Sequence, residues 1–165
     1  MKATYSAIFV SAMLLASVGG ASATSWIQAS STEEQLAADP KPKVVTMNST
    51  DGAKNIKMEK GVVRVNENGA FFIIAAAQVG GKGKGLVRMW MRVNGKDVDN
   101  SNTEQLIGDP SFTAVLVSQG VAELKRGDRV EVVFSGSEPG VGLVVKKPTG
   151  EPVVPSIIFS GWRID

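Results

Sequence analysis

The chain has 165 residues, with 18 basic and 16 acidic side chains and neither cysteine nor histidine. A formal net charge of +2 provides little attraction for nucleic acid or for an anionic membrane. The missing residue types exclude disulfide bonds and remove the commonest general base and the commonest zinc ligand. The composition therefore predicts a fold that is held by packing or by assembly, with no nucleic-acid partner.

Residues 1–23 have the pattern of a secretory signal peptide. Lys2 gives a positive start, residues 7–18 form an uncharged apolar run, and Ala21-Ser22-Ala23 is a small-residue cleavage sequence. The apolar run is shorter than the roughly 20 residues that a membrane-spanning helix needs. We expect cleavage after Ala23 and a secreted product, extracellular or periplasmic, with no membrane insertion after the signal is removed.

Residues 24–43 are mostly polar and are predicted to be an N-terminal segment and linker. Ser31 and Glu34 have the spacing of a helix capping box, and Asp39-Pro40 would end any helix. This pattern predicts about one helical turn at residues 32–38.

Residues 44–165 are β-patterned almost throughout and are predicted to form one domain. Residues 71–77 are a continuous apolar run, typical of a strand buried on both faces, and residues 87–93 alternate as a strand with one buried face does. Residues 79–85, rich in glycine and lysine, are expected to be a flexible loop. Further strands are predicted at residues 62–65, 113–118, 121–124, 129–135, 141–146 and 157–164, with turns that include Asn94-Gly95, Gln119-Gly120 and Glu138-Pro139-Gly140. Many short strands with such turns predict an all-β, antiparallel two-sheet sandwich.

Four motifs in this order resemble the globular head of complement C1q and the tumour-necrosis-factor (TNF) superfamily. The resemblance covers residues 44–165 and implies a jelly-roll sandwich of about ten strands, usually assembled as a trimer and used for recognition. A collagen stalk is absent, and the partners of animal members are not carried over. The motifs are the strand pair at residues 61–72, the strand ending in Val93-Asn94-Gly95, the turn and strand Leu124-Lys125-Arg126-Gly127-Asp128-Arg129-Val130, and Phe159-Ser160-Gly161-Trp162.

No catalytic residue, cofactor-binding residue or metal ligand is predicted. Gly83-Lys84 is followed by glycine and a β-pattern, not by the Ser or Thr and helix of a phosphate-binding loop. No serine has a recognisable base beside it, although paired carboxylates for sugar cleavage are not excluded by the sequence. Residues 97–102 supply alternating oxygen ligands without the glycine and glutamate of an EF-hand, so a weak calcium site there stays an open alternative to a solvated turn.

Arg88, Trp90 and Arg92 are the candidate ligand-binding residues. Side chains two apart on a strand share a face, so an indole between two guanidinium groups could bind a sugar ring, a carboxylate or another anionic group. The alternative is that the arginine stems and neighbouring loops cover Trp90 and stabilise the sheet.

Phe72, Phe159 and Trp162 are the candidate residues of a subunit contact. The strand at residues 157–164 has large apolar groups on both faces, and so does the strand at residues 71–77. A sandwich strand that faces water should be polar on its outer side, so a second partner is expected. In the resembled fold the neighbouring subunit provides this partner, which predicts a homotrimer.

Two functions follow from the sequence. The first is a secreted, non-enzymatic, trimeric recognition module of the C1q/TNF-like type, with an extracellular protein or glycan as its unknown ligand. The second is a carbohydrate-binding or carbohydrate-active jelly roll.

Overall fold

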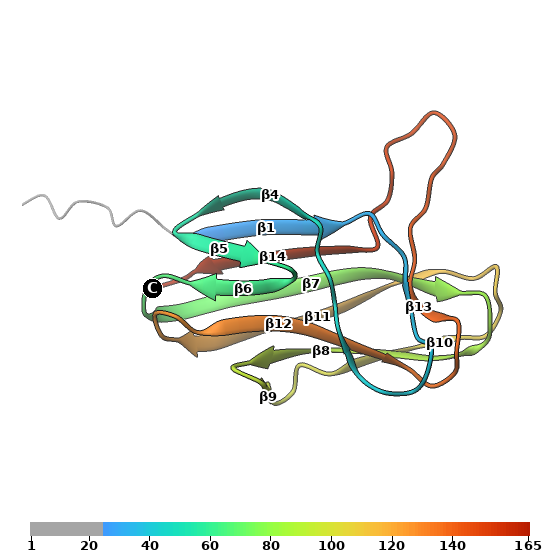
Figure 1. The fold of residues 1–165 in the computed structure, drawn as a ribbon, viewed down its shortest axis with the longest axis horizontal. Coiled ribbons are helices and arrows are strands. Elements are labelled where there is room, and N and C mark those ends of the chain that lie inside the picture. The colour runs from blue at the N-terminus through green and yellow to red at the C-terminus, as the bar shows by residue number, and fades with distance from the viewer. Residues whose placement is uncertain (1–24) are drawn as a thin grey trace, which may run out of the picture.

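The computed structural model describes residues 25–165, which form a two-sheet β-sandwich (Figure 1). The predicted signal peptide lies outside the described residues. Residues 25–165 contain fourteen strands, and every pairing between them is antiparallel. In chain order they are β1 (Trp26–Ser31), β2 (Gln35–Leu36), β3 (Lys43–Val44), β4 (Ser49–Lys54), β5 (Ile56–Glu59), β6 (Val62–Val65), β7 (Gly69–Gly81), β8 (Gly85–Val93), β9 (Lys96–Asp97), β10 (Thr103–Ile107), β11 (Ala114–Leu124), β12 (Arg129–Gly136), β13 (Val141–Leu143) and β14 (Ile157–Arg163).

Ten of these strands form the two main layers, five in each. Sheet A has the order β4-β1-β14-β7-β11, with β13 and then β2 continuing beside the far end of β7. Sheet B has the order β5-β6-β12-β8-β10, with β3 beside β12 and β9 beside β8. The predicted class, an all-β jelly-roll sandwich of about ten strands, is confirmed; four strands of two or three residues are added to it.

The core lies between the two sheets and follows from the period of two along each strand. In β7 the side chains of Phe71, Ile73 and Ala75 are buried, whereas the residues between them are only partly covered. Phe134 and Phe159 fill the same interior from β12 and β14. Each main strand therefore contributes one face to a single hydrophobic core, and the outer faces of the sheets are left for other roles.

The structure corrects the prediction that residues 24–43 are an N-terminal segment and linker. β1 is an internal strand of sheet A, paired with β14 on one side and β4 on the other, so this segment is part of the sandwich rather than a linker. The helical turn at residues 32–38 is also wrong. Gln35 lies in β2, and its side-chain amide bonds both the backbone N–H and the backbone C=O of Thr46. Tertiary pairing satisfies this backbone better than an isolated helical turn would.

Two predicted irregular regions are strands in the structure. Gln119-Gly120 makes no turn, because β11 runs unbroken and pairs with β7 along its whole length. The flexible loop predicted at residues 79–85 shrinks to residues 82–84, because β7 extends to Gly81. At Gly81 a Cβ atom would lie 2.2 Å from the carbonyl oxygen of Gly140, so glycine lets β13 approach β7 this closely.

Candidate functional site

The outer face of sheet A carries a row of large apolar side chains across four strands. Cross-strand partners point to the same face of a sheet, and the register aligns Val121 of β11, Phe72 of β7, Trp162 of β14 and Trp26 of β1. We call these four residues the apolar row. The rings of Phe72 and Trp162 lie against each other, with centroids 4.8 Å apart and planes tilted by 42°.

Three of the four residues of the apolar row are exposed to solvent in the single chain, and Phe72 is half-buried. The exposed fractions are 58% for Val121, 42% for Trp26 and 39% for Trp162. The next rows along the same face add Ile74, Ala76 and Ile158, together with Val117 and Val115 at the edge. A contiguous exposed apolar face of this kind is typical of a surface that meets a partner.

The three predicted contact residues separate onto two sides of sheet A. Phe72 and Trp162 lie on the outer face, within the apolar row. Phe159 does not: it is 1% exposed and packs in the core, because odd-numbered residues of β14 point inward. In β14, Ile157, Phe159 and Gly161 are buried, whereas Ile158 and Trp162 are exposed on the opposite face. Trp26 was not among the predicted contact residues because its segment was interpreted as a linker, although it is the first large apolar residue after the predicted signal peptide.

A second apolar surface lies at the edge of the sandwich, where β10 and β11 end their sheets. Leu106 of β10 and Phe112 of the following loop are exposed, and Val115 of β11 is near them in the chain. A shallow hollow between Leu106 and Phe112 is also lined by Gly108 and Asp109. Edge strands with exposed apolar side chains favour association unless something covers them.

The outer face of sheet B carries Arg88, Trp90 and Arg92, and the polar groups of these side chains contact other groups of the protein. Trp90 is 8% exposed, and its indole Nε1 donates a hydrogen bond of 2.8 Å to Oδ1 of Asp97. Arg92 pairs with the same carboxylate at 2.9 Å, and Arg88 pairs with Glu104 at 2.6 Å. The three residues share a face, as the spacing predicts, but this geometry matches the alternative in which Trp90 is covered and stabilises the sheet.

Asp97 organises this part of sheet B. The hydrogen bond from Trp90, then the one from Arg92, holds the pKa of its carboxyl below the ordinary value. In the same loop the Ser101 hydroxyl donates to the Val98 carbonyl and accepts from the N–H of Met91. Within residues 25–165 no group of three or more acidic, histidine or cysteine side chains could hold a metal ion. The oxygen atoms of Asp97 and Ser101 thus serve the packing of this loop against β8.

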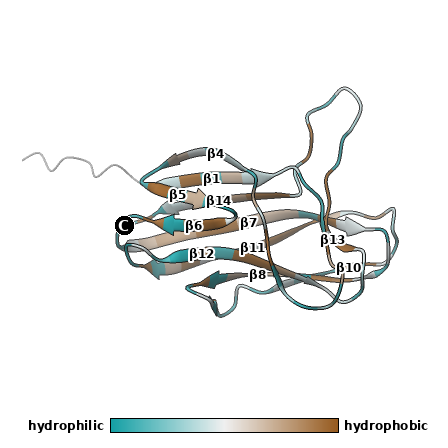
Figure 2. Cartoon of the chain, viewed as in Figure 1, coloured by the Kyte–Doolittle hydropathy of each residue, from teal (hydrophilic) through white to brown (hydrophobic). Residues whose placement is uncertain are grey.

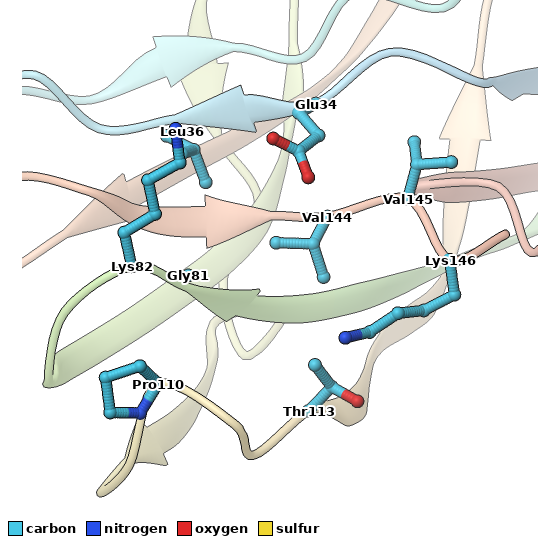
Figure 3. Close-up of a pocket in the computed structure, with 9 residues that line it drawn as sticks. All are labelled: Glu34, Leu36, Gly81, Lys82, Pro110, Thr113, Val144, Val145 and Lys146. Carbon is cyan, nitrogen blue, oxygen red and sulfur yellow. The ribbon is translucent and has the colours of Figure 1, made fainter.

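A small pocket of about 100 Å³ lies at the far end of β7 (Figure 3). Its floor is apolar, with Val144 and Leu36, and the side chains of Glu34, Lys146 and Thr113 surround it. The volume accommodates a few water molecules or one small ion, so it does not form a binding site for a polymer or a drug-sized ligand. It also lies at the opposite end of β7 from the apolar row.

These features define a C1q/TNF-like jelly roll with an exposed apolar sheet face, and the solved structures with the same fold agree. Murine APRIL at pH 5.0, a TNF-family protein, has a TM-score of 0.62 and 11% identity, with 86% of this chain and 100% of that chain covered. The globular domain of the zebrafish complement 1qA protein has a TM-score of 0.50 and 17% identity, with coverage of 86% and 98%. At such identities the likeness establishes the fold.

No protein-family model matches the sequence. No curated protein matches it either. Among the residues that the structure describes, there is no helix long and apolar enough to cross a membrane.

Proposed function

We propose that this protein is a secreted, non-enzymatic recognition module that assembles as a homotrimer through the outer face of sheet A. The observation that carries the proposal is the apolar row, which crosses four strands of that face and is left in water by the single chain. Burial of one Phe or Trp side chain is worth roughly 2–3 kcal/mol. Repeated at three contacts, such burial supplies stability that a chain without cysteine cannot draw from disulfide bonds.

A closed threefold ring requires two different patches that meet, because its contacts are heterologous. The apolar row and the edge surface around Leu106 and Phe112 lie on different parts of the same sandwich. We infer that the edge surface of one subunit packs on the face of sheet A of the next. This arrangement would also cover β11, whose outer edge would otherwise be open to uncontrolled pairing.

The non-enzymatic part of the proposal draws on the state of the ionisable groups. The carboxyl groups with a lowered pKa are Asp97, Asp109, Asp128 and Asp165, and each is held there mainly by hydrogen bonds from neighbouring protein groups. Catalytic carboxyl groups that act as acids are usually shifted upward instead. These aspartates therefore serve the structure of turns and strand ends.

Light scattering coupled to gel filtration tests the assembly at micromolar concentration, with a chain that begins at Thr24. The wild type is expected at three times the monomer mass. Trp162→Ser should weaken association more than tenfold, because about 2 kcal/mol of apolar burial is lost at each contact. Val153→Ser is the matched control: Val153 has a similar exposed fraction but lies in the loop between β13 and β14.

A monomeric mass for the wild type would overturn the trimer. An unchanged trimer in the Trp162→Ser variant would place the contact on another face. The melting temperature of each variant, measured in the same samples, distinguishes loss of association from loss of the fold.

A second candidate, a carbohydrate-binding jelly roll, is favoured by the two exposed indoles of Trp26 and Trp162. Aromatic rings that lie on an open sheet face offer flat surfaces on which sugar rings stack. This function needs the same surface as the trimer, so the two exclude each other. A monomer whose tryptophan fluorescence responds to added glycans would favour the second candidate.

A further inference from the structure

Basic side chains line up across three strands on the outer face of sheet B, at the β5–β6 edge. The register places Lys57 of β5 opposite Arg64 of β6, and Arg64 opposite Arg129 of β12. Adjacent strands are about 4.8 Å apart, so the backbone positions of the three basic residues span about 10 Å. Like charges directly opposite each other destabilise a sheet. We call these three residues the basic row.

The charges of the basic row are only partly neutralised by the protein. Arg129 pairs with Glu131 at 3.1 Å, whereas Lys57 and Arg64 form no ion pair with any described residue. Arg64 and Arg129 line an open depression of about 540 Å³, together with Lys60, Glu59 and Val62. Figure 2 shows hydrophilic colour on β6 and on the adjacent start of β12. The depression is therefore a basic surface whose positive charges are only partly matched by Glu59 and Glu131.

The turn between β11 and β12 extends this surface. Lys125 and Arg126 lie there, and the turn is fixed to the end of β6 by a hydrogen bond from Gly127 N–H to the Val65 carbonyl. The Asp128 carboxylate is already occupied by the N–H of Lys125 and the amide of Asn94. The basic side chains of this surface and its turn are Lys57, Lys60, Arg64, Lys125, Arg126 and Arg129, in a chain whose whole formal charge is only +2.

We propose that the basic row and its depression bind an anionic polysaccharide, one whose sulfate or carboxylate groups repeat along a flexible chain. The lining of the depression has no aromatic side chain on which a nucleic-acid base could stack and no large apolar group that could insert into a membrane. It also lacks the aromatic anchor that is typical of protein–protein hot spots. A hydrophilic polymer of spaced oxyanions is the class of ligand that fits these features. The inference names a ligand for the recognition module proposed above and depends on that proposal for its extracellular setting.

Fluorescence anisotropy with labelled, size-defined dextran sulfate tests this site, and neutral dextran of the same length is the control probe. The double variant Lys57→Gln, Arg64→Gln should bind dextran sulfate at least tenfold more weakly. The slope of log Kd against log salt should fall by about two, one counterion for each lost contact. Lys82→Gln, Lys84→Gln removes the same charge from the exposed loop between β7 and β8 and should retain wild-type affinity within about twofold.

Equal losses in the two double variants would overturn the site, because they would show that only net charge matters. Unchanged binding in the Lys57, Arg64 variant would also overturn it. Equal affinity for dextran sulfate, polyphosphate and single-stranded DNA would contradict the polysaccharide assignment and leave a general polyanion surface. Light scattering on the same samples keeps this result separate from the trimer, because a monomeric chain would still present the basic row.

Discussion

Trp90 combines burial with a single polar contact. Its indole lies on the outer face of sheet B, yet it is almost fully covered and donates to a carboxylate that also accepts from Arg92. Since Trp carries one donor, Asp97 satisfies its whole hydrogen-bonding capacity. The side chain therefore behaves as a core residue on the outer side of a sheet.

Substitution of Trp90 should destabilise the fold rather than a ligand complex. We expect Trp90→Ala to lower the free energy of unfolding by about 3 kcal/mol, because a large buried side chain leaves a cavity. Trp90→Phe keeps most of the apolar area and loses the bond to Asp97, so about 1 kcal/mol is expected. Urea unfolding measures both. A Trp90→Ala variant with wild-type stability would contradict the buried placement and restore Trp90 as a ligand-binding candidate.

Two glycines of sheet A differ in whether the structure has room for a Cβ atom. At Gly142 of β13 a Cβ atom would lie 2.4 Å from the carbonyl oxygen of Gln35, so only glycine allows β2 to pair this closely. At Gly120 of β11 nothing lies within 4 Å of the same position. The first glycine is required by packing and the second is not.

These two positions make a matched pair of substitutions. Gly142→Ala should lower the free energy of unfolding by about 1–3 kcal/mol, because the methyl group overpacks the β2–β13 pair. Gly120→Ala should be neutral or stabilising by about 0.5–1 kcal/mol, since alanine loses less chain entropy in a strand. Thermal unfolding of both variants checks the pair. A destabilised Gly120→Ala variant would argue against a continuous β11.

Strand periodicity predicted most of sheets A and B, and non-local contacts explain the rest. The two-sided apolar pattern of β7 and β14 correctly indicated an outer face that is not polar. The pattern could not decide between Phe159 and Trp162, because both are aromatic residues of one strand and only the direction of the core separates them. Gln119-Gly120 has the chemistry of a turn, and pairing with β7 overrides it. Likewise, nothing local in residues 24–43 reveals that their partners include β14, more than a hundred residues later in the chain.

At the scale of the whole molecule, the two sheets present contrasting outer faces. Sheet A offers the apolar row, and sheet B offers the basic row with its ion-paired neighbours. Assembly through sheet A would leave the face of sheet B outermost on every subunit. Three copies of one weak anion site on a rigid trimer would then bind a long polymer far more tightly than one copy does.

Export should leave a chain that begins close to β1. Ser25 is buried, and its carbonyl accepts a hydrogen bond of 2.9 Å from the N–H of Arg163, so the sandwich already includes the second residue after Ala23. We expect intact mass spectrometry of the secreted protein to give a first residue of Thr24. A mass that retains residues 1–23 would contradict the signal peptide, and a mass that lacks Trp26 would be incompatible with β1 in sheet A.

The position of β14 between β7 and β1 bears on the order in which the chain can fold. β1 and β4 join the rest of sheet A only through β14, and Ser156 reaches back to Ser31, 125 residues earlier. The first strand can pair with β4 early, but it remains without its second partner until residues 157–163 have left the ribosome. Contacts so distant in sequence make folding slow. Sheet A therefore cannot close before β14 has been synthesised, and this delay would suit the proposed export, which requires a chain that has not yet folded.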